Sequence, residues 1–287
     1  MAKTQKSKTA TFQRATKNSQ RKKTIWRWSI GIALVVIFGI FIGFLNHSQS
    51  QKAEEREKSQ QEEIASLPEN KPDLISSTGS FAIGQDGTPI EPSEARTDVP
   101  RVEFIFDLHC PGCHMVDTAL NESLVDHVKD GSIQLWLTPV AFTASHSTDY
   151  YSDRAASALV TVAQDQPEKL LPFMAKLYQE FPDSGPSYEP VSYETIGSWA
   201  QEVGVSAEVA DSFSEQKYRW FATENVEVQK NRLEIFPAGE MTTPTILIGG
   251  SQDDMGVLED FYRVSFSDSD VVGTFSKAFE EATGQSW

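Results

Sequence analysis

The two cysteines of this chain lie together at residues 110–113, in the sequence Cys-Pro-Gly-Cys, directly after a run of strand-forming residues. Residues 101–107 (RVEFIFD) are rich in β-branched and aromatic side chains and are apolar on both faces. This composition predicts a central strand that is covered by helices. From residue 110 onward, apolar residues recur at steps of three and four positions, which predicts an amphipathic helix. A strand that leads into a helix at the cysteine pair is therefore the feature that most restricts the fold.

The elements that follow extend this pattern into an α/β domain. Residues 132–137 (SIQLWL) have the composition of a second strand, so strand, helix and strand form a βαβ unit with parallel strands. Residues 153–236 are mostly helical in pattern, and strand character returns at residues 243–250 (TPTILIGG). Residues 270–283 predict a last amphipathic helix. We therefore expect a sheet flanked by helices, with a helical insertion over about residues 153–236.

A cysteine pair in this place is suited to redox chemistry. At the first turn of a helix, the Cys110 sulfur faces unpaired backbone N–H groups and the positive end of the helix dipole, which favour the thiolate. Cys113 lies one turn further in, close enough for a disulfide but more buried. Pro111 suits an early helical position because its missing N–H has no helical partner there. Gly112 leaves room for another chain segment to approach closely.

The residues around the pair leave other chemistry open. Cys110, Cys113 and His114 satisfy C-x-x-C-H, the attachment motif of c-type haem, with His114 as the proximal iron ligand. Candidates for the distal ligand are Met174, Met241 and Met255. A metal site made by the pair with His109 and His114 is disfavoured, because four ligands within six residues do not surround a tetrahedral ion. The two histidines either add positive charge beside the thiolate or take no part in the chemistry.

Three features together resemble the DsbA-like branch of the thioredoxin superfamily over residues 79–287. The first is the segment at residues 102–113 (VEFIFDLHCPGC), with Asp107 three positions before the first cysteine. The second is Thr243-Pro244 at the start of a strand, and the third is the 131 positions between Cys113 and Pro244. The resemblance implies a thioredoxin-like fold with a mixed central sheet. It also implies a cis-Pro244 that faces the redox pair, and a Thr243 backbone that pairs with the substrate chain.

The resemblance also implies a function. A redox-active Cys110–Cys113 disulfide, with no other cofactor, would oxidise the dithiols of reduced or folding exported proteins, and a membrane partner would restore it. The alternatives of the same fold are a thiol reductase and a binding module without catalysis. Phe104 stands where relatives often have a buried acid. Glu103 is one position away and is therefore expected to face the other side of the sheet, so it does not replace that acid. Asp107 is then the candidate proton shuttle, or it caps the helix.

The N-terminal region predicts a membrane anchor. Residues 1–28 form a basic tail, since nine of the 25 Lys and Arg residues lie within positions 1–29 and the first acidic residue is Glu54. Residues 29–46 are uncharged and almost wholly apolar, long enough for a transmembrane helix, with the basic flank predicting a cytoplasmic N-terminus. A cleaved signal peptide is the alternative. Residues 47–78 are expected to be a polar stalk. The acidic remainder, expected outside the cytoplasm, argues against nucleic-acid binding.

Overall fold

Among the residues that the computed structural model describes, six strands form one mixed sheet in the order β2-β1-β4-β3-β5-β6. The described residues are 55, 58–60, 62–183, 187–252, 258–266 and 270–287. The strands are β1 (Phe81–Ile83), β2 (Pro89–Ile90), β3 (Arg101–Phe106), β4 (Gln134–Pro139), β5 (Thr245–Gln252) and β6 (Leu258–Arg263). The sheet belongs to a compact unit that spans Ser59–Trp287.

Strand β3 lies at the centre of the sheet, as the sequence predicts. It runs parallel to β4, with Phe104 opposite Leu137, and antiparallel to β5, with Phe104 opposite Ile246. All six of its residues are buried, because helices cover both faces. The pattern of the sequence did not predict β6, which pairs antiparallel with β5 at the edge of the sheet.

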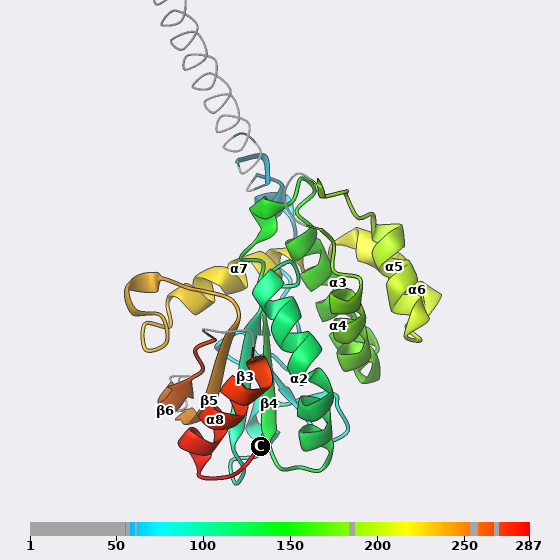
Figure 1. The fold of residues 1–287 in the computed structure, drawn as a ribbon. Helices are drawn as coiled ribbons and strands as arrows, with labels where there is room; N and C mark the ends of the chain where they lie inside the picture. Colours follow the sequence, from blue (N-terminus) through cyan, green and yellow to red (C-terminus); the bar gives the residue numbers. More distant parts are fainter. Residues whose placement is uncertain (1–54, 56–57, 61, 184–186, 253–257, 267–269) are drawn as a thin grey trace, which may run out of the picture. The chain divides into compact units, whose positions relative to one another are not determined.

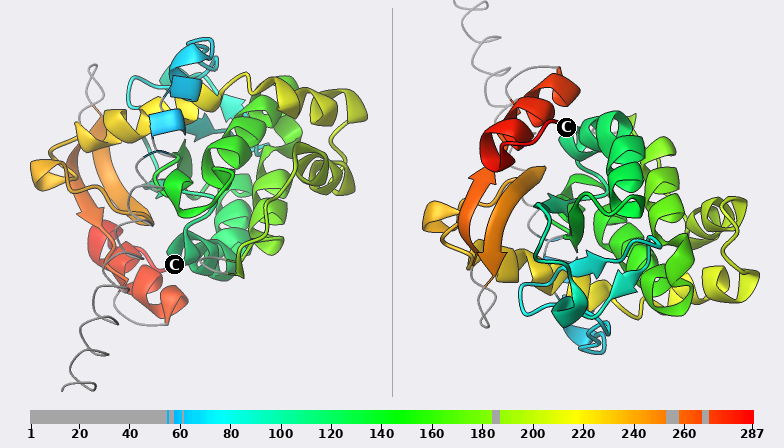
Figure 2. Two further views of the ribbon diagram at one scale, coloured as in Figure 1. Left: turned by 90° about the horizontal axis from the view of Figure 1, so that it is seen from above. Right: turned by 90° about the horizontal axis from the view of Figure 1, so that it is seen from below.

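Helices enclose the sheet on its two faces (Figure 1). The helices are α2 (Pro111–Lys129), α3 (Tyr151–Asp165), α4 (Leu170–Gln179), α5 (Tyr193–Glu202), α6 (Ala207–Asp211), α7 (Arg219–Lys230) and α8 (Val271–Thr283). Residues Val102, Phe104 and Phe106 of β3 join the main core with α2, α4 and α8. Ile105 points to the opposite face and packs with Val226 of α7 in a smaller core. The views along the other axis in Figure 2 show α7 and α8 on opposite sides of the strands.

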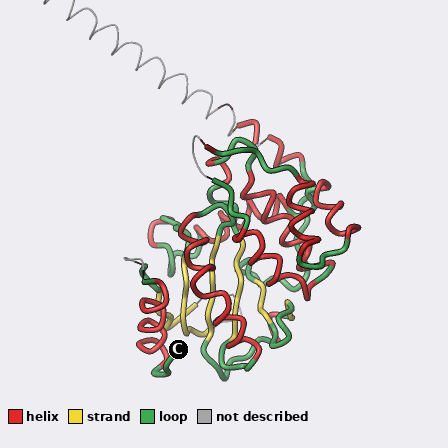
Figure 3. The backbone as a smooth tube through the Cα atoms, turned by 45° about the vertical axis from the view of Figure 1, so that its right-hand side comes forward, coloured by secondary structure: helices red, strands yellow, loops and turns green. Residues whose placement is uncertain are grey.

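The helical insertion is present between β4 and β5. It contains the helices α3 to α7, which lie beside the strands in Figure 3. Two of these helices, α5 and α6, have a serine as the N-cap residue. The Ser192 hydroxyl accepts a hydrogen bond from the N–H of Thr195, and the Ser206 hydroxyl accepts one from Val209. This segment continues the main core, and the expected mixed α/β architecture with a helical insertion is confirmed.

The N-terminal part of the compact unit differs from the expected polar stalk. Residues 59, 60 and 62–78 belong to the compact unit, with Gln60 and Ile64 both buried. The Gln60 amide donates to Asp153 of α3 at 2.9 Å, and Glu63 pairs with Arg219 of α7 at 2.5 Å. Burial of Ile64 and these polar contacts explain why the fold begins before residue 79.

The expected basic tail (residues 1–28) and transmembrane segment (residues 29–46) lie outside the described residues. Within the described part of the chain, the structure has no helix that is both long and apolar enough to cross a bilayer.

Candidate active site

Cys110 lies at the end of the connection between β3 and α2. It is the N-cap residue of α2, with extended backbone angles, and Pro111 takes the first helical position. Its carbonyl accepts the first helical hydrogen bond, from the N–H of His114 at 3.1 Å. The Cys110 side chain is mostly buried and retains 7% of its accessible surface. The helix start and this small exposed area make the Cys110 sulfur the accessible one of the pair.

Cys113 lies one helical turn later and is completely buried. Its sulfur accepts a hydrogen bond from the backbone N–H of Asp107 at 3.4 Å. The Cys113 thiol hydrogen-bonds to the Cys110 sulfur and, against the opposing effect of burial, lowers the pKa of Cys110 to about 6. Burial raises the pKa of Cys113 well above its usual value. The two thiols are therefore strongly unequal, with an anionic outer sulfur and a neutral inner one at pH 7.

Pro244, the residue before β5, lies beside the cysteines although 131 positions of sequence separate it from Cys113. The Thr243–Pro244 peptide bond is cis, and the Cys110 thiol donates to the Thr243 carbonyl at 3.3 Å. A Cβ atom on Gly112 would lie 2.8 Å from Cδ of Pro244, which is closer than such atoms approach. Glycine at position 112 is thus what lets the helix start and the proline loop come together.

The carboxylate of Asp107 ties this site to the next connection of the fold. It is fully buried and accepts hydrogen bonds of 2.6–2.8 Å from the backbone N–H of His109, the N–H and hydroxyl of Thr143, and the hydroxyl of Ser152. These donors occupy both carboxylate oxygens. The carboxylate therefore anchors the loop before Cys110. It does not cap α2, because the N-cap residue is Cys110 and no side chain caps this helix.

The main chain of Asp107 adds further contacts at the same point. Its N–H donates to Cys113, and its carbonyl accepts from the N–H of Cys110 at 3.2 Å and from the hydroxyl of Tyr178 in α4 at 3.2 Å. Tyr178 is buried and reaches the cysteines from the helical insertion. The insertion therefore supports the redox site directly.

A family model described as thioredoxin matches residues 95–261, which is more than half of the chain. The chain belongs to the thioredoxin family. The matched region holds the cysteine pair, Pro244 and the whole helical insertion. No curated protein sequence matches the chain.

Solved structures share the thioredoxin-like fold. MdbA, a thiol-disulfide oxidoreductase from Corynebacterium diphtheriae, is 19% identical with a TM-score of 0.50, over 73% of this chain and 96% of that chain. The reduced disulfide bond oxidoreductase DsbG from Mycobacterium tuberculosis is 20% identical with a TM-score of 0.51, over 75% and 92%. Oxidised BdbD from Bacillus subtilis is 17% identical with a TM-score of 0.50, over 75% and 98%. These likenesses establish the fold that the sequence predicts.

The two histidines of this thioredoxin-family site lie in an aromatic cluster. The His109 ring packs against Tyr151, Phe181 and Tyr188, with ring centroids 5.4–5.7 Å apart, and the His114 ring lies 4.8 Å from Phe181. Burial lowers the pKa of His109, so its ring is neutral at pH 7. His109 therefore packs beside the active-site loop and does not supply the positive charge that is one alternative for it.

Asp117 is a buried residue near the pair that sequence reasoning missed. It lies on α2, one turn after Cys113, and accepts a hydrogen bond from the side-chain amide of Asn121 at 3.1 Å. Burial raises the pKa of Asp117 to about 6, against the effect of that bond. The signal was an acid four positions after Cys113, between Val116 and Leu120 of the apolar stripe.

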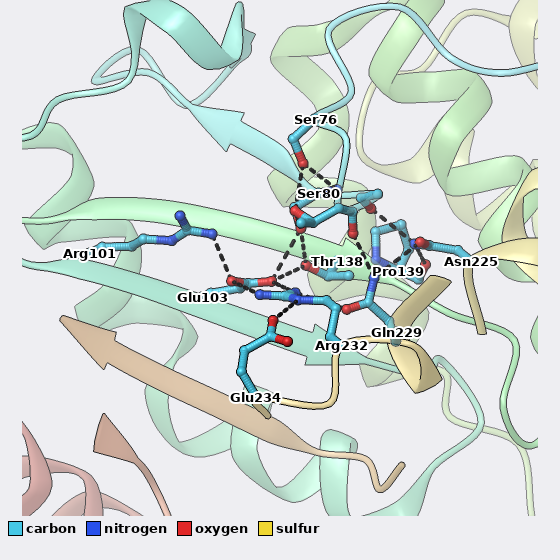
Figure 4. A network of polar contacts seen from close by, with 12 residues as sticks. Ser76, Ser80, Arg101, Glu103, Thr138, Pro139, Asn225, Gln229, Arg232 and Glu234 are labelled. Atoms are coloured by element: carbon cyan, nitrogen blue, oxygen red, sulfur yellow. Dashed lines mark hydrogen bonds and ion pairs between the residues drawn. The ribbon is translucent and has the colours of Figure 1, made fainter. Parts of the chain in front are cut away.

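Glu103 points away from the cysteines, as expected from its position in β3. It is completely buried on the α7 side of the sheet and pairs with Arg101 at 2.7 Å and Arg232 at 2.6 Å (Figure 4). Burial alone would raise the pKa of Glu103, but the charges of Arg232 and Arg101 outweigh it and lower it to about 2. A carboxylate held in this way is a structural group and not a proton carrier for Cys113.

The residues of the C-x-x-C-H motif do not fit a covalently bound haem. Attachment needs both sulfurs to reach the porphyrin, whereas Cys113 is fully enclosed beneath the start of α2. Met174 and Met241 are both buried in core clusters, and Met241 belongs to the cluster on the α7 face; Met255 lies outside the described residues. Among the described residues, His, Cys, Asp and Glu form no group that is able to hold a metal ion.

Proposed function

We propose that this chain is an extracytoplasmic thiol–disulfide oxidoreductase that oxidises dithiols of exported proteins through a Cys110–Cys113 disulfide. The observation that carries the proposal is the environment of the Cys110 sulfur. The sulfur lies at a helix start and accepts a hydrogen bond from the buried Cys113 thiol. It also lies beside the carbonyl before cis-Pro244, to which it donates when protonated. The activity named for the MdbA and DsbG structures that share the fold is consistent with this proposal.

The unequal pair supports a two-step exchange. In the oxidised protein, a substrate thiolate attacks the Cys110 sulfur, forms a mixed disulfide and releases Cys113. A second substrate thiolate then attacks the substrate sulfur of that mixed disulfide and leaves Cys110 as the thiolate. The lowered pKa of Cys110 makes it a good leaving group and stabilises the reduced protein, which favours net oxidation of the substrate.

The proposal extends to the substrate and to the partner. The backbone of Thr243, beside Cys110, would pair with the main chain of an extended substrate and so bind many sequences. We place the domain outside the cytoplasm, with residues 29–46 as the anchor, because a stable disulfide needs an oxidising compartment. A membrane protein that accepts two electrons would then restore the disulfide.

The redox potential of the full-length protein tests the direction of the reaction. The protein is equilibrated with glutathione buffers, the thiols are trapped by acid, and the oxidised fraction is measured by mass. A potential of about −120 mV is typical of a strong oxidant and would support the proposal, whereas about −270 mV is typical of thioredoxin and would make the chain a reductase. If variants that lack Cys110 or Cys113 still showed the same two-electron redox couple, the pair would not be the redox centre.

The pH dependence of alkylation tests the active sulfur. We expect the rate of iodoacetamide reaction with the reduced protein to rise with pH and to level off above an inflection near pH 6, because the thiolate reacts. The matched control is Cys110→Ser, which leaves only the enclosed Cys113 and should react far more slowly at pH 7. An inflection at about 8.5, the value of an ordinary cysteine, would contradict the proposed role of Cys110.

A further inference from the structure

Four acidic side chains are buried in the described part of the domain: Glu103, Asp107, Asp117 and Asp153. Glu103 is paired with two arginines, and Asp153 with Arg219 at 2.9 Å. Asp107 accepts hydrogen bonds at both oxygens. Asp117 differs from the other three, because Asn121 is its hydrogen-bond partner and no ion pair among the described residues includes it. A buried carboxyl with so little compensation has a thermodynamic cost, which points to a role beyond packing.

Its place on α2 brings Asp117 close to the inner cysteine. Residues four positions apart lie one above the other on a helix, and helical side chains lean toward the N-terminus. This rule places Asp117 on the same side of α2 as Cys113, and both residues are buried. The side chain of Asn121, four positions further on, donates to the Asp117 carboxyl. His114, one turn before Asp117 on the same helix, and Tyr178 from α4 are the other titratable groups beside it.

The Cys113 sulfur needs a proton partner that is available in its enclosed site. It is released as a thiolate when the disulfide opens, and it must lose its proton again when the disulfide forms. Water does not reach Cys113 directly, because the side chain has no accessible surface. Asp107 touches this sulfur only through its backbone N–H, and its carboxylate is fully occupied by four donors. Asp117 is free of such bonds on one oxygen and keeps 5% of its surface in contact with solvent.

We propose that Asp117 is the residue that exchanges a proton with Cys113 during each opening and closing of the disulfide. The inference rests on the proposed thiol–disulfide exchange and adds to it the group that carries the proton. One helical turn separates the two residues on the buried side of α2, and side chains at this spacing are neighbours on a helix. Through its exposed edge, the carboxyl exchanges the same proton with bulk water.

The proton moves from Asp117 to Cys113 when the disulfide opens and back to Asp117 when it closes. When a substrate thiolate attacks Cys110, the bond between the two cysteine sulfurs breaks, and the Cys113 thiolate takes the proton of the Asp117 carboxyl. When the reduced protein is oxidised again, Asp117 as carboxylate accepts the proton of the Cys113 thiol. The resulting thiolate attacks the Cys110 sulfur of the mixed disulfide, and the other thiolate leaves. A carboxyl whose pKa burial has raised to about 6 serves both directions near neutral pH.

The test separates the two steps of oxidation by glutathione disulfide. The reduced full-length protein is mixed with glutathione disulfide, quenched with acid at successive times, and analysed by mass for thiol, glutathionylated and disulfide forms. The first step, attack by Cys110, should proceed at the same rate in wild type and in Asp117→Asn. The second step, attack by Cys113, should be about 10- to 100-fold slower in Asp117→Asn, so that the glutathionylated form accumulates.

A pH series and two further variants distinguish proton exchange from a packing effect. In the wild type, the second step should accelerate as the Asp117 carboxyl loses its proton. In Asp117→Asn it should accelerate only at the higher pH where solvent removes the Cys113 proton. Asp117→Glu, which restores a carboxyl, should recover most of the rate, and Asp126→Asn, an exposed acid on the same helix, should match the wild type.

Two results would overturn the inference in distinguishable ways. If the wild type forms its disulfide normally and Asp117→Asn has the same second-step rate from pH 5 to 9, then Asp117 does not carry the proton, while the proposed function stands. If the wild type forms neither the glutathionylated nor the disulfide form, then the proposed function fails and this inference fails with it.

Discussion

Two regions of the domain bury polar groups in opposite ways. On the α7 face of the sheet, the Glu103 carboxylate is held by two arginines and by the hydroxyl of Thr138 at 3.1 Å (Figure 4). At the active-site end, the Cys113 sulfur accepts one backbone hydrogen bond of 3.4 Å and hydrogen-bonds with the Cys110 sulfur. The Asp117 carboxyl accepts one hydrogen bond, from the Asn121 amide. The two regions lie on opposite sides of β3, because alternate residues of a strand face opposite ways.

The difference separates charges that stay fixed from groups that change protonation. Glu103 is ionised throughout the ordinary pH range because its partners lower its pKa to about 2. Burial raises the pKa of Asp117 to about 6, so its neutral and charged forms are close in energy near neutral pH. Burial also raises the pKa of Cys113 well above its usual value, so this thiol needs a proton acceptor before it can react. A site that must gain and lose protons cannot surround its groups with fixed opposite charge, since this would lock one form.

Replacing Glu103 with Gln should produce the largest loss of stability. The change removes the buried carboxylate that pairs with Arg101 and Arg232, and breaking a buried ion pair costs about 3–5 kcal/mol in comparable sites. Denaturant unfolding at pH 7 measures this, with Glu234→Gln as the control, because Glu234 is a distant, partly exposed partner of Arg232 at 3.4 Å. The redox potential of Glu103→Gln should equal that of the wild type, and a changed potential would break the separation between the two regions.

The direction in which stability changes with pH follows from the lowered pKa of Glu103. Its contribution to stability is complete above its ordinary pKa of about 4.5 and is lost as the pH falls through about 2. The wild type should therefore lose stability in this acidic range, and Glu103→Gln should lose less. Equal losses in both proteins would mean that the ion pairs of Glu103 are not responsible.

Replacing Asp107 with Asn tests the residue that joins the active-site loop to the connection after β4. An amide offers one acceptor oxygen in place of two, so a buried N–H of His109 or Thr143 loses its partner, at a cost of about 2 kcal/mol. The negative charge of Asp107 also raises the pKa of Cys110, so the variant should shift the alkylation inflection of Cys110 to lower pH. Asp126→Asn is the control for both measurements. An inflection that moves upward would show that Asp107 acts on the thiol through its position and not its charge.

Local patterns in the sequence were sufficient for the framework of the site. The apolar run of β3, the stripe of α2 and the Thr243-Pro244 pair each specify an element, and the fold brings all three together as expected. Burial on both faces explains the near-continuous apolar content of β3. The position of Glu103 away from the cysteines followed from the two-residue repeat of a strand together with the resemblance, in which relatives have the buried acid at the position of Phe104.

The remaining contacts depend on partners that are distant in sequence. Arg232 reaches Glu103 across 129 positions, and Glu63 reaches Arg219 across 156, so no local pattern specifies either pair. Residues 59–66 look like a polar linker because their composition does not reveal that Gln60 meets a buried acid. Asp117 was overlooked for a related reason, since its burial comes from α4 packing on α2 and not from its own helix.

Replacing Asp117 with Asn should give the smallest change in the free energy of unfolding, and this change should be a gain in stability. An acid whose folded pKa is raised to about 6, above the ordinary 3.8, makes the folded protein less stable as the pH rises through that interval. The amide removes this cost, so we expect the variant to be more stable than the wild type by about 1 kcal/mol at pH 7.5 and no more stable at pH 3.5. Denaturant unfolding at the two pH values measures the difference, with Asp126→Asn as the matched exposed change on α2. A gain in stability together with a slower second step of disulfide formation would mean that the domain keeps an unfavourable buried acid for its chemistry. A loss of stability at pH 7.5 would place Asp117 with Glu103, among the acids that hold the fold together.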